Sequence, residues 1–296
     1  MPSNLSTLTL SCIGAGRLGK TLCRLFSDTV SIGQIINSST ASAQLAADFI
    51  GAGQGQGDYV ELQPANIWLI TTPDDSIQQA SEALKNTGVL RESDTVFHCS
   101  GSLSAQVLGL DNCPTASVHP IHSFADPEKS VARFAGTACG IEGDPDAVAL
   151  LDTLFRHIGA EPFAIASEHK SLYHAATVLT CNYLVSLLEL GKQMLTAAGV
   201  ETNNQTGASN PLEPLIRQTV DNYLSTDAVS ALTGPIARGD SRTIEAHLKA
   251  LQNQPDLWQQ VYCALGNATV PISAKQGQAS ADDLQIISAL LQSDIK

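Results

Sequence analysis

The sequence predicts an α/β protein in which an N-terminal doubly wound parallel sheet is followed by an all-helical C-terminal domain. A glycine-rich turn, Gly14-x-Gly16-x-x-Gly19, stands between an apolar run and a helical pattern. Strand and helix patterns then alternate up to about residue 166, and the pattern beyond it is helical. We therefore predict domains over residues 1–165 and 166–296.

The first half alternates short apolar runs with amphipathic stretches, which is the rhythm of βαβ units. Residues 51–57, Gly-Ala-Gly-Gln-Gly-Gln-Gly, follow a helix rather than a strand, so we expect a flexible connection there. The predicted strands are Thr7–Ile13, Ser31–Ile36, Tyr59–Leu62, Asn66–Thr71, Thr95–Cys99, Ser117–His119, Thr137–Ile141 and Pro162–Ala166, and the predicted helices are Arg17–Phe26, Ala41–Ile50, Asp75–Lys85 and Pro145–Ile158.

The second half begins with apolar residues at three- and four-residue spacing, which predicts one long helix over Glu168–Ala198, closed by Gly199. Residues 203–214 are rich in Asn, Gly, Ser and Pro and predict a loop. Further helices are expected at Leu215–Leu224, Ser241–Leu251, Leu257–Ala268 and Ala281–Gln292.

Composition excludes several classes of protein. A hydrophobic content of 43% with 15% charged residues is typical of a soluble globular chain, and no apolar run is long enough to span a membrane. The net charge of −13, without a basic run, argues against nucleic acid as a partner. The seven cysteines are odd in number and scattered, which favours the reducing cytoplasm over a disulfide framework or a zinc site. The N-terminus has no basic region of the kind that opens a signal peptide.

The glycine turn carries the most specific signal, because each glycine has a task in a Rossmann dinucleotide site. Gly14 makes the tight turn out of the strand, Gly16 lets the backbone approach a pyrophosphate, and Gly19 lets the helix pack on the sheet. The helix N-terminus then offers free N–H groups to the phosphates. An ordinary strand-to-helix turn with three glycines is the alternative.

The residues after the second strand favour NADP over NAD, although NAD is not excluded by them. An NAD site usually places a carboxylate there, whereas this chain has Asn37-Ser38-Ser39-Thr40. Arg17 is the nearest cation for a 2′-phosphate, or else an exposed residue of the first helical turn. The turn Thr71-Thr72-Pro73-Asp74-Asp75 is expected beneath the cofactor. The predicted cofactor contacts are Gly14, Ala15, Gly16, Arg17, Leu18, Gly19, Ser38, Ser39, Thr72 and Pro73.

Three histidines, His98, His119 and His122, lie at or just beyond the carboxyl ends of predicted strands, where ligands of such sheets bind. A histidine there can act as an acid or base near neutral pH. For His119 we favour a catalytic role, whereas His98 and His122 are equally compatible with structural roles. Ser100 and Gly101, directly after a strand, are expected to face the substrate. Two nearby histidines without a third ligand do not predict a metal site.

The long helix places Lys170, His174, Thr177 and Cys181 on one face, with Tyr173 beside them. Such a stripe needs partners if it is buried, and a ligand cleft would supply them. We therefore predict Lys170 and His174 as catalytic residues. Arg238, in the turn Thr233–Asp240, is predicted to bind a substrate carboxylate, with an ion pair to Asp240 as the alternative.

These motifs together resemble the 6-phosphogluconate dehydrogenase-like reductases, which include hydroxyisobutyrate dehydrogenases, pyrroline-5-carboxylate reductases and prephenate dehydrogenases. Within that group the chain is most similar to Rossmann-like proteins with a DUF2520 region. Four segments carry this likeness, which extends over nearly the whole chain: Phe97–Gly101, Ser117–Pro120, Tyr173–Ala176 and Thr233–Asp240.

The resemblance also supplies two residue comparisons. Hydroxyacid dehydrogenases of the group use a helical lysine with an asparagine four residues on, and here Lys170 is followed by His174 instead. Prephenate dehydrogenases carry a catalytic His-Pro pair that His119-Pro120 resembles, but their Met-x-Gly continuation is replaced by Ile121-His122-Ser123. The likeness therefore transfers no specific substrate.

The sequence thus predicts an NADP-dependent oxidoreductase that moves hydride between nicotinamide and a small carbonyl or imine substrate bearing a carboxylate. His119 or Lys170 would supply the proton, His174 would orient the substrate, and the helical domain would form a homodimer. The alternative from another class is a non-catalytic, redox-responsive regulator that binds a dinucleotide. A methyltransferase fits poorly, because the glycine spacing matches a pyrophosphate site.

Overall fold

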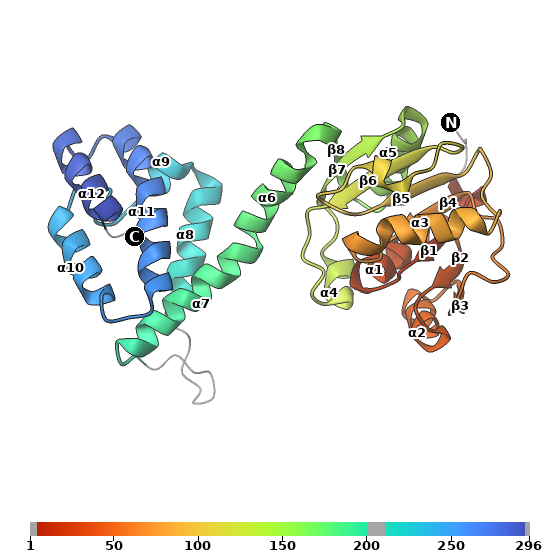
Figure 1. Cartoon of the computed structure of the whole chain (residues 1–296), viewed down its shortest axis with the longest axis horizontal. Coiled ribbons are helices and arrows are strands. Elements are labelled where there is room, and N and C mark those ends of the chain that lie inside the picture. Colours follow the sequence, from red (N-terminus) through yellow and green to blue (C-terminus); the bar gives the residue numbers. More distant parts are fainter. Residues whose placement is uncertain (1–4, 201–210, 294–296) are drawn as a thin grey trace. The chain divides into compact units, whose positions relative to one another are not determined.

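The computed structural model describes residues 5–200 and 211–293 of the chain (Figure 1). It divides into two compact units, Met1–Asn182 and Tyr183–Lys296. We call them the sheet unit and the helical unit. The prediction of an α/β sheet followed by helices is confirmed.

The sheet unit is built on eight strands in the order β3-β2-β1-β4-β5-β6-β7-β8. The order reverses between β1 and β4, as it does in doubly wound sheets. The strands are β1 (Thr9–Ile13), β2 (Ser31–Ile36), β3 (Gln54–Gln56), β4 (Ile67–Ile70), β5 (Thr95–His98), β6 (Thr115–Pro120), β7 (Ala138–Gly143) and β8 (Glu161–Ala164).

One neighbouring pair departs from the predicted all-parallel sheet, because β6 and β7 run antiparallel. A parallel connection needs a helix that crosses back over the sheet. The segment between these strands contains only the short helix α4 (Pro127–Ala132), which packs beside α1 (Arg17–Phe26). The chain therefore turns back on itself, so that Ser117 stands opposite Glu142 and His119 opposite Gly140.

The predictions for residues 51–62 are wrong. The edge strand β3 lies inside the glycine-rich stretch expected to be a flexible connection, and Tyr59–Leu62 forms no strand. Gly55 allows β3 to lie directly on α2 (Thr40–Ile50), since a β-carbon there would be 2.5 Å from the Gln44 nitrogen. Tyr59 and Leu62 instead pack against the core on one face of the sheet.

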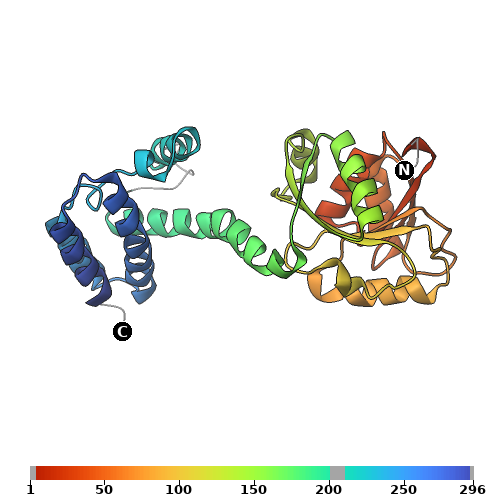
Figure 2. The same ribbon diagram turned by 90° about the horizontal axis from the view of Figure 1, so that it is seen from above.

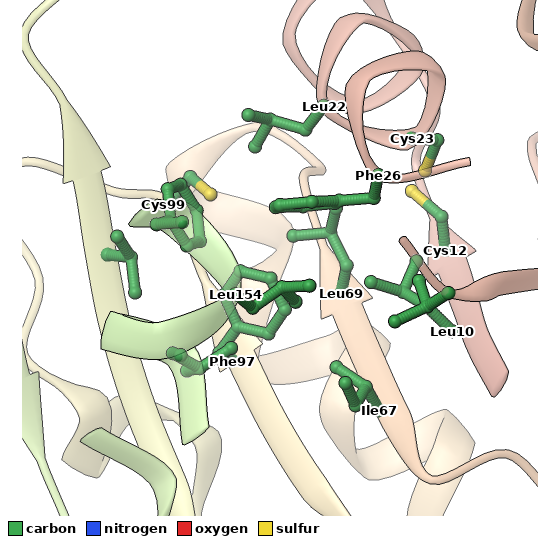
Figure 3. Close-up of a cluster of buried hydrophobic side chains, with 14 of the residues drawn as sticks. Leu10, Cys12, Leu22, Cys23, Phe26, Ile67, Leu69, Phe97, Cys99 and Leu154 are labelled. Carbon is green, nitrogen blue, oxygen red and sulfur yellow. The ribbon is translucent and has the colours of Figure 1, made fainter. Parts of the chain in front are cut away.

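Helices cover both faces of the sheet (Figure 2). The helices α1 and α5 (Pro145–His157) pack on one face, and α3 (Ile77–Asn86) packs on the other. In the core of the first face, Figure 3 shows Leu22, Cys23 and Phe26 of α1 among buried side chains of the strands. The Phe155 ring of α5 lies edge-on to Phe26, with a centroid distance of 5.2 Å. This packing holds the start of α1 at the carboxyl edge of the sheet.

The helix predicted over Glu168–Ala198 is interrupted at Cys181, giving α6 (Lys170–Thr180) and α7 (Asn182–Ala197). The predicted loop at 203–214 lies largely outside the described residues, and α8 starts at Glu213. The predicted helix Leu257–Ala268 is longer and runs through Pro271. The remaining helices are α8 (Glu213–Ser225), α9 (Ala228–Ala231), α10 (Ser241–Leu251), α11 (Asp256–Gln276) and α12 (Ala281–Ser293). The core of the helical unit is made by Ile236, Ile244, Leu248, Cys263, Leu284, Ile287 and Leu291.

Candidate functional site

The glycine turn borders a cavity of about 800 Å³ at the carboxyl edge of β1, β2 and β4. Gly14 adopts a φ of +86°, and a β-carbon there would lie 2.7 Å from the Thr72 nitrogen. A β-carbon on Gly19 would overlap the Thr71 hydroxyl, so only glycine lets α1 approach β4. The cavity is lined by Ile13, Gly14, Gly16, Arg17, Leu18, Ile36, Asn37, Ser38, Ser42, Gly57, Asp58, Tyr59, Thr71, Thr72 and Pro73.

Three predicted cofactor contacts, Ala15, Gly19 and Ser39, do not line this cavity. Ala15 is buried in the core, and Gly19 packs against Thr71. Ser39 caps α2, where its hydroxyl accepts a hydrogen bond from the Ser42 N–H at 3.3 Å. Asp58 is a cavity residue that the sequence analysis missed, because it follows a segment read as a loose connection.

The residues around this cavity fit a pyrophosphate group. Gly16 precedes α1 and makes no side-chain cap, and the first turn contains no acidic residue. The first N–H groups of the helix therefore have no anionic competitor beside them. A β-carbon on Gly16 would have no neighbour nearer than 3.9 Å, so the space beside it is open to a ligand.

A second group of polar residues lies where α6 packs on β6 and β7. The antiparallel register sets Ser117 beside Glu142 and, two residues along, His119 beside Gly140. Residues two apart on a strand share a face. From α6, Lys170 reaches the first of these pairs and Tyr173 reaches the second. We call the two sets, Ser117–Glu142–Lys170 and His119–Gly140–Tyr173, the lysine rung and the histidine rung.

In the lysine rung, the side chain of Lys170 is only 1% exposed, and its ammonium group uses all its donors within the protein. It donates to the Ser100 carbonyl at 3.0 Å, to the Ser117 hydroxyl and to Glu142 Oε1 at 3.4 Å. Burial lowers the pKa of Lys170, and the Glu142 carboxylate opposes that change. The geometry is that of a buried ion pair that fixes the turn at Ser100.

Glu142 was not among the predicted site residues, since a single acid in a strand forms no motif. It is satisfied from three sides. Besides Lys170, it accepts hydrogen bonds from the Ala105 N–H at 2.9 Å and from the Ser167 hydroxyl at 2.6 Å. A charged residue in an otherwise apolar strand was the available signal.

In the histidine rung, Nδ1 of His119 lies 2.8 Å from the Tyr173 hydroxyl, and the two rings meet edge-on with centroids 5.5 Å apart. Burial raises the pKa of Tyr173 to about 12. The pKa of His119 is lowered to about 4, chiefly by burial and then by the nearby His174 and Lys170. His119 is therefore neutral near pH 7.

Gly101 and Gly140 make room for these rings. A β-carbon on Gly101 would overlap Nδ1 of His174 and lie 2.9 Å from Nε2 of His119. One on Gly140 would lie 2.9 Å from the Tyr173 hydroxyl oxygen. The rings of His119 and His174 meet edge-on with centroids 5.4 Å apart. The predicted residues Gly101, His119 and His174 are thus brought together.

Asp74 joins this cluster to the glycine-turn cavity. It follows Pro73, which lines the cavity, and its Oδ2 accepts hydrogen bonds from the hydroxyls of Ser100 at 2.7 Å and Ser102 at 3.1 Å. The predicted residue Ser100 therefore contacts the turn beneath the cavity on one side and Lys170 on the other.

The other two histidines predicted at strand ends, His98 and His122, have structural surroundings. His98 accepts a hydrogen bond from the Ser100 N–H at Nδ1, which leaves the proton on Nε2 to bond the Ser104 carbonyl at 3.1 Å. Burial lowers its pKa to about 4. His122 packs against Phe124 and Phe134.

Arg238 lies in the helical unit, exposed in the turn before α10. Asp240 in the same turn caps α10 and feels the charge of Arg238, which contributes to lowering its pKa. Across residues 5–200 and 211–293, no three metal-ligating side chains gather as a cation site. None of the helices in these ranges is long and apolar enough to span a membrane.

Comparisons with known proteins agree with this architecture. Residues 137–269 match the family described as Domain of unknown function (DUF2520). A protein of Bacteroides fragilis, provisionally named an NADP oxidoreductase, is 21% identical, with a TM-score of 0.73 over 92% of this chain and 99% of the other. Protein TM1727 of Thermotoga maritima is 25% identical, with a TM-score of 0.65 over 97% and 100% of the two chains.

An imine reductase from a Pseudomonas species is 17% identical, with a TM-score of 0.58 over 97% of this chain and 99% of the other. No protein of curated function matches the sequence. The resemblance predicted from the sequence is confirmed as a similarity: residues 137–269 match the DUF2520 model, and nearly the whole chain shares its fold with these structures.

Proposed function

We propose that the protein is an NADP-dependent oxidoreductase that transfers hydride between nicotinamide and the carbon of a small C=O or C=N substrate. The supporting observation is the hydrogen-bonded link from the glycine-turn cavity through Asp74 and Ser100 to the lysine rung. His119 and the buried Lys170, whose pKa values are both lowered, are perturbed groups of the kind that mark active sites. The similar folds of an imine reductase and an NADP oxidoreductase agree with this proposal.

NADP would lie with its pyrophosphate at the N-terminus of α1 and its 2′-phosphate between Arg17 and Ser38, which both line the cavity. When bound, NADPH supplies the hydride from its nicotinamide ring. Asp58 lines the same cavity, and its charge opposes a 2′-phosphate. The cation at Arg17 and the hydroxyls at Ser38 and Ser42 favour NADP over NAD in this proposal.

Among the candidate proton donors, the geometry favours His119. The three N–H groups of Lys170 are engaged by protein oxygens, so it holds the Ser100–Gly101 turn rather than reaching a substrate. Nε2 of His119 lies on the side of the ring that faces Gly101. In the proposed mechanism, His119 donates a hydrogen bond from Nε2–H to the substrate heteroatom, which takes its proton from solvent as hydride reaches the carbon, and His174 orients the substrate beside it.

Arg238 is proposed to bind a carboxylate of the substrate, because it is exposed in an irregular turn and a guanidinium group suits a planar anion. An Arg238→Ala variant would then raise KM for substrates with a carboxylate and leave KM for other substrates unchanged. Equal effects on both kinds of substrate would remove Arg238 from the substrate site.

The test is NADPH oxidation by the full-length protein with a panel of imines, ketones and aldehydes, with and without a carboxylate. His119→Ala should reduce kcat by about 10²–10³-fold, the usual effect of removing one hydrogen-bond donor to the developing charge, and leave NADPH affinity by calorimetry unchanged. His157→Ala, an exposed histidine on α5, is the matched control. NADPH binding without turnover of any compound would favour the redox-responsive regulator instead.

We also propose that the protein is a homodimer formed through the helical unit. Helices α7 and α8 expose large apolar side chains, among them Tyr183, Val185, Leu215, Tyr223 and Leu224, each more than half exposed. Exposed apolar side chains that gather on neighbouring segments often mark an interface. Light scattering after size-exclusion chromatography should give twice the mass of 31.1 kDa, and a monomer at micromolar concentration would contradict the proposal.

A further inference from the structure

The hydroxyl group of Tyr173 is a part of the site that the proposed reaction does not use. It lies 2.8 Å from Nδ1 of His119 and 3.5 Å from the His119 carbonyl oxygen. It is held there by ring packing on both sides, because Tyr173 meets His119 edge-on and Phe163 at a centroid distance of 6.1 Å. The missing side chain of Gly140 leaves the space that this hydroxyl occupies.

We propose that Tyr173 is a positioning residue: its hydroxyl donates to Nδ1 of His119 and so keeps the imidazole in the tautomer whose proton is on Nε2. A phenol that stays protonated is a donor, and a neutral imidazole has one acceptor nitrogen. Once Nδ1 accepts from Tyr173, the only ring proton left is on Nε2. That nitrogen faces Gly101, where the substrate is expected. The catalytic role of this tautomer rests on the proposed function, whereas the tautomer itself does not depend on it.

The surroundings of His119 agree with a neutral donor. His174 and Lys170 disfavour a positive charge on its ring, and Asp74 is the carboxylate that acts in the opposite direction. The pKa of Tyr173 is raised, so it remains a phenol and cannot act as an anionic base near pH 7. His119 would therefore polarise the substrate through a hydrogen bond from Nε2–H. Nδ1, which accepts a hydrogen bond from Tyr173, would not take up a proton.

The chain contains a matched control. In the helical unit, Nδ1 of His247 lies 2.8 Å from the Tyr262 hydroxyl, and these rings also meet edge-on, with centroids 5.8 Å apart. The local pairing is the same as in the histidine rung, but in the described residues no hydrogen bond or ring contact joins this pair to His119, Lys170 or His174. Tyr262→Phe therefore removes an equivalent hydroxyl outside the proposed site.

The test is nitrogen NMR of the full-length protein labelled with ¹⁵N-histidine, with signals assigned from His119→Asn and His247→Asn variants. The wild type should show an unprotonated Nδ1 and a protonated Nε2 at His119. Tyr173→Phe should redistribute the proton between the two nitrogens, whereas Tyr262→Phe should affect only His247. A proton on Nδ1 of His119 in the wild type, or an unchanged distribution in Tyr173→Phe, would overturn the proposal.

Kinetics give a second readout with whichever panel compound is reduced. Tyr173→Phe should lower kcat about tenfold, the effect of losing about one hydrogen bond, with KM for NADPH unchanged. The acid limb of the kcat–pH profile should also move to higher pH, because the neutral imidazole loses a partner. A wild-type kcat and pH profile in Tyr173→Phe would contradict the positioning role. A panel without turnover would refute the proposed function, while the NMR result would still decide the tautomer.

Discussion

The two units of the chain differ in what they bury. The sheet unit buries charged and polar side chains, including Asp94, Glu142 and Lys170, whereas Ser273 is the one such side chain buried in the described part of the helical unit. Exposed large apolar residues occur in both units but are more frequent in the described part of the helical unit, especially on α7 and α8. Buried charge is costly unless it is paired and hydrogen-bonded. The concentration of buried charge in the sheet unit therefore agrees with the proposed active site there.

The two tyrosine–histidine pairs sharpen this comparison. Both have a hydroxyl 2.8 Å from Nδ1 and nearly perpendicular rings. His119 is enclosed with His174 and Lys170 nearby, and its pKa is lowered to about 4, whereas His247 is exposed to solvent. The same local contact therefore acquires a functional meaning only from the charges and the burial around it.

The largest effect is expected from Glu142→Ala, which leaves the Lys170 ammonium buried without its counter-ion. Breaking a buried pair in this way costs about 3–5 kcal/mol in the free energy of unfolding. Urea denaturation should detect the loss, and hydrogen exchange should locate it in the sheet unit. The exposed pair Lys129–Asp126 supplies the control, since Lys129→Ala removes a solvent-exposed partner and should change stability little. Equal losses in the two variants would contradict the assignment of Glu142.

A somewhat smaller effect is expected from acid. The pKa values of His98 and His119 are lowered to about 4, below the value of about 6.5 in an unfolded chain. Between pH 6.5 and 4 these imidazoles are protonated in the unfolded state but not in the folded state. The free energy of unfolding therefore decreases as the pH is lowered, by up to about 3 kcal/mol for each imidazole. Urea denaturation of His98→Asn should show a shallower decline over this range. The exposed variant His157→Asn should keep the wild-type slope.

Gly19→Ala should have the next largest effect, since its β-carbon would overlap the Thr71 hydroxyl and lie 3.1 Å from the Gly14 carbonyl. Overpacking of this kind costs about 1–3 kcal/mol. Because α1 would move away from β4, NADPH affinity measured by calorimetry should also fall. Gly88→Ala, at a turn with no atom near the added carbon, is the control for NADPH binding. Undiminished affinity in Gly19→Ala would exclude the close-packing role.

The smallest effect is expected from Tyr262→Phe in the helical unit. Its hydroxyl pairs with a solvent-exposed histidine, so removing it should cost less than about 1 kcal/mol. Thermal denaturation would measure this change, and kcat should stay at the wild-type value. A large loss of activity would show that the two units are not as different as their buried residues indicate.

Much of the fold follows from local pattern. The spacing of Gly14, Gly16 and Gly19 and the apolar strands around them predict the sheet correctly, because each position has one steric or packing requirement. The strand β3 cannot be predicted from local pattern, since Gln54–Gln56 is a polar edge strand held by backbone pairing with β2. The antiparallel turn of β7 also escapes prediction, because the composition of a strand does not specify its direction.

The candidate site divides in the same way. His119, Lys170 and His174 stand out because polar residues at strand ends or on one face of an apolar helix are unusual. Glu142 and Asp74 do not stand out in the sequence. Their hydrogen-bond partners, Lys170 and Ser100, are 28 and 26 residues away, and only the fold brings each pair together. Tyr173 lies beside the polar face of α6 that the sequence predicts, but its hydroxyl reaches His119 only because Gly140 leaves space for it.

The antiparallel pairing of β6 and β7 has a consequence for how this protein can tolerate insertions and deletions. Both rungs depend on residues that face each other across one ladder, and the ladder is independent of the length of the connecting segment between Ile121 and Thr137. Added residues at the exposed tips of that segment should leave the site intact. A single residue inserted between Gly140 and Glu142 would turn one of them to the opposite face of the sheet and separate the lysine rung from the histidine rung.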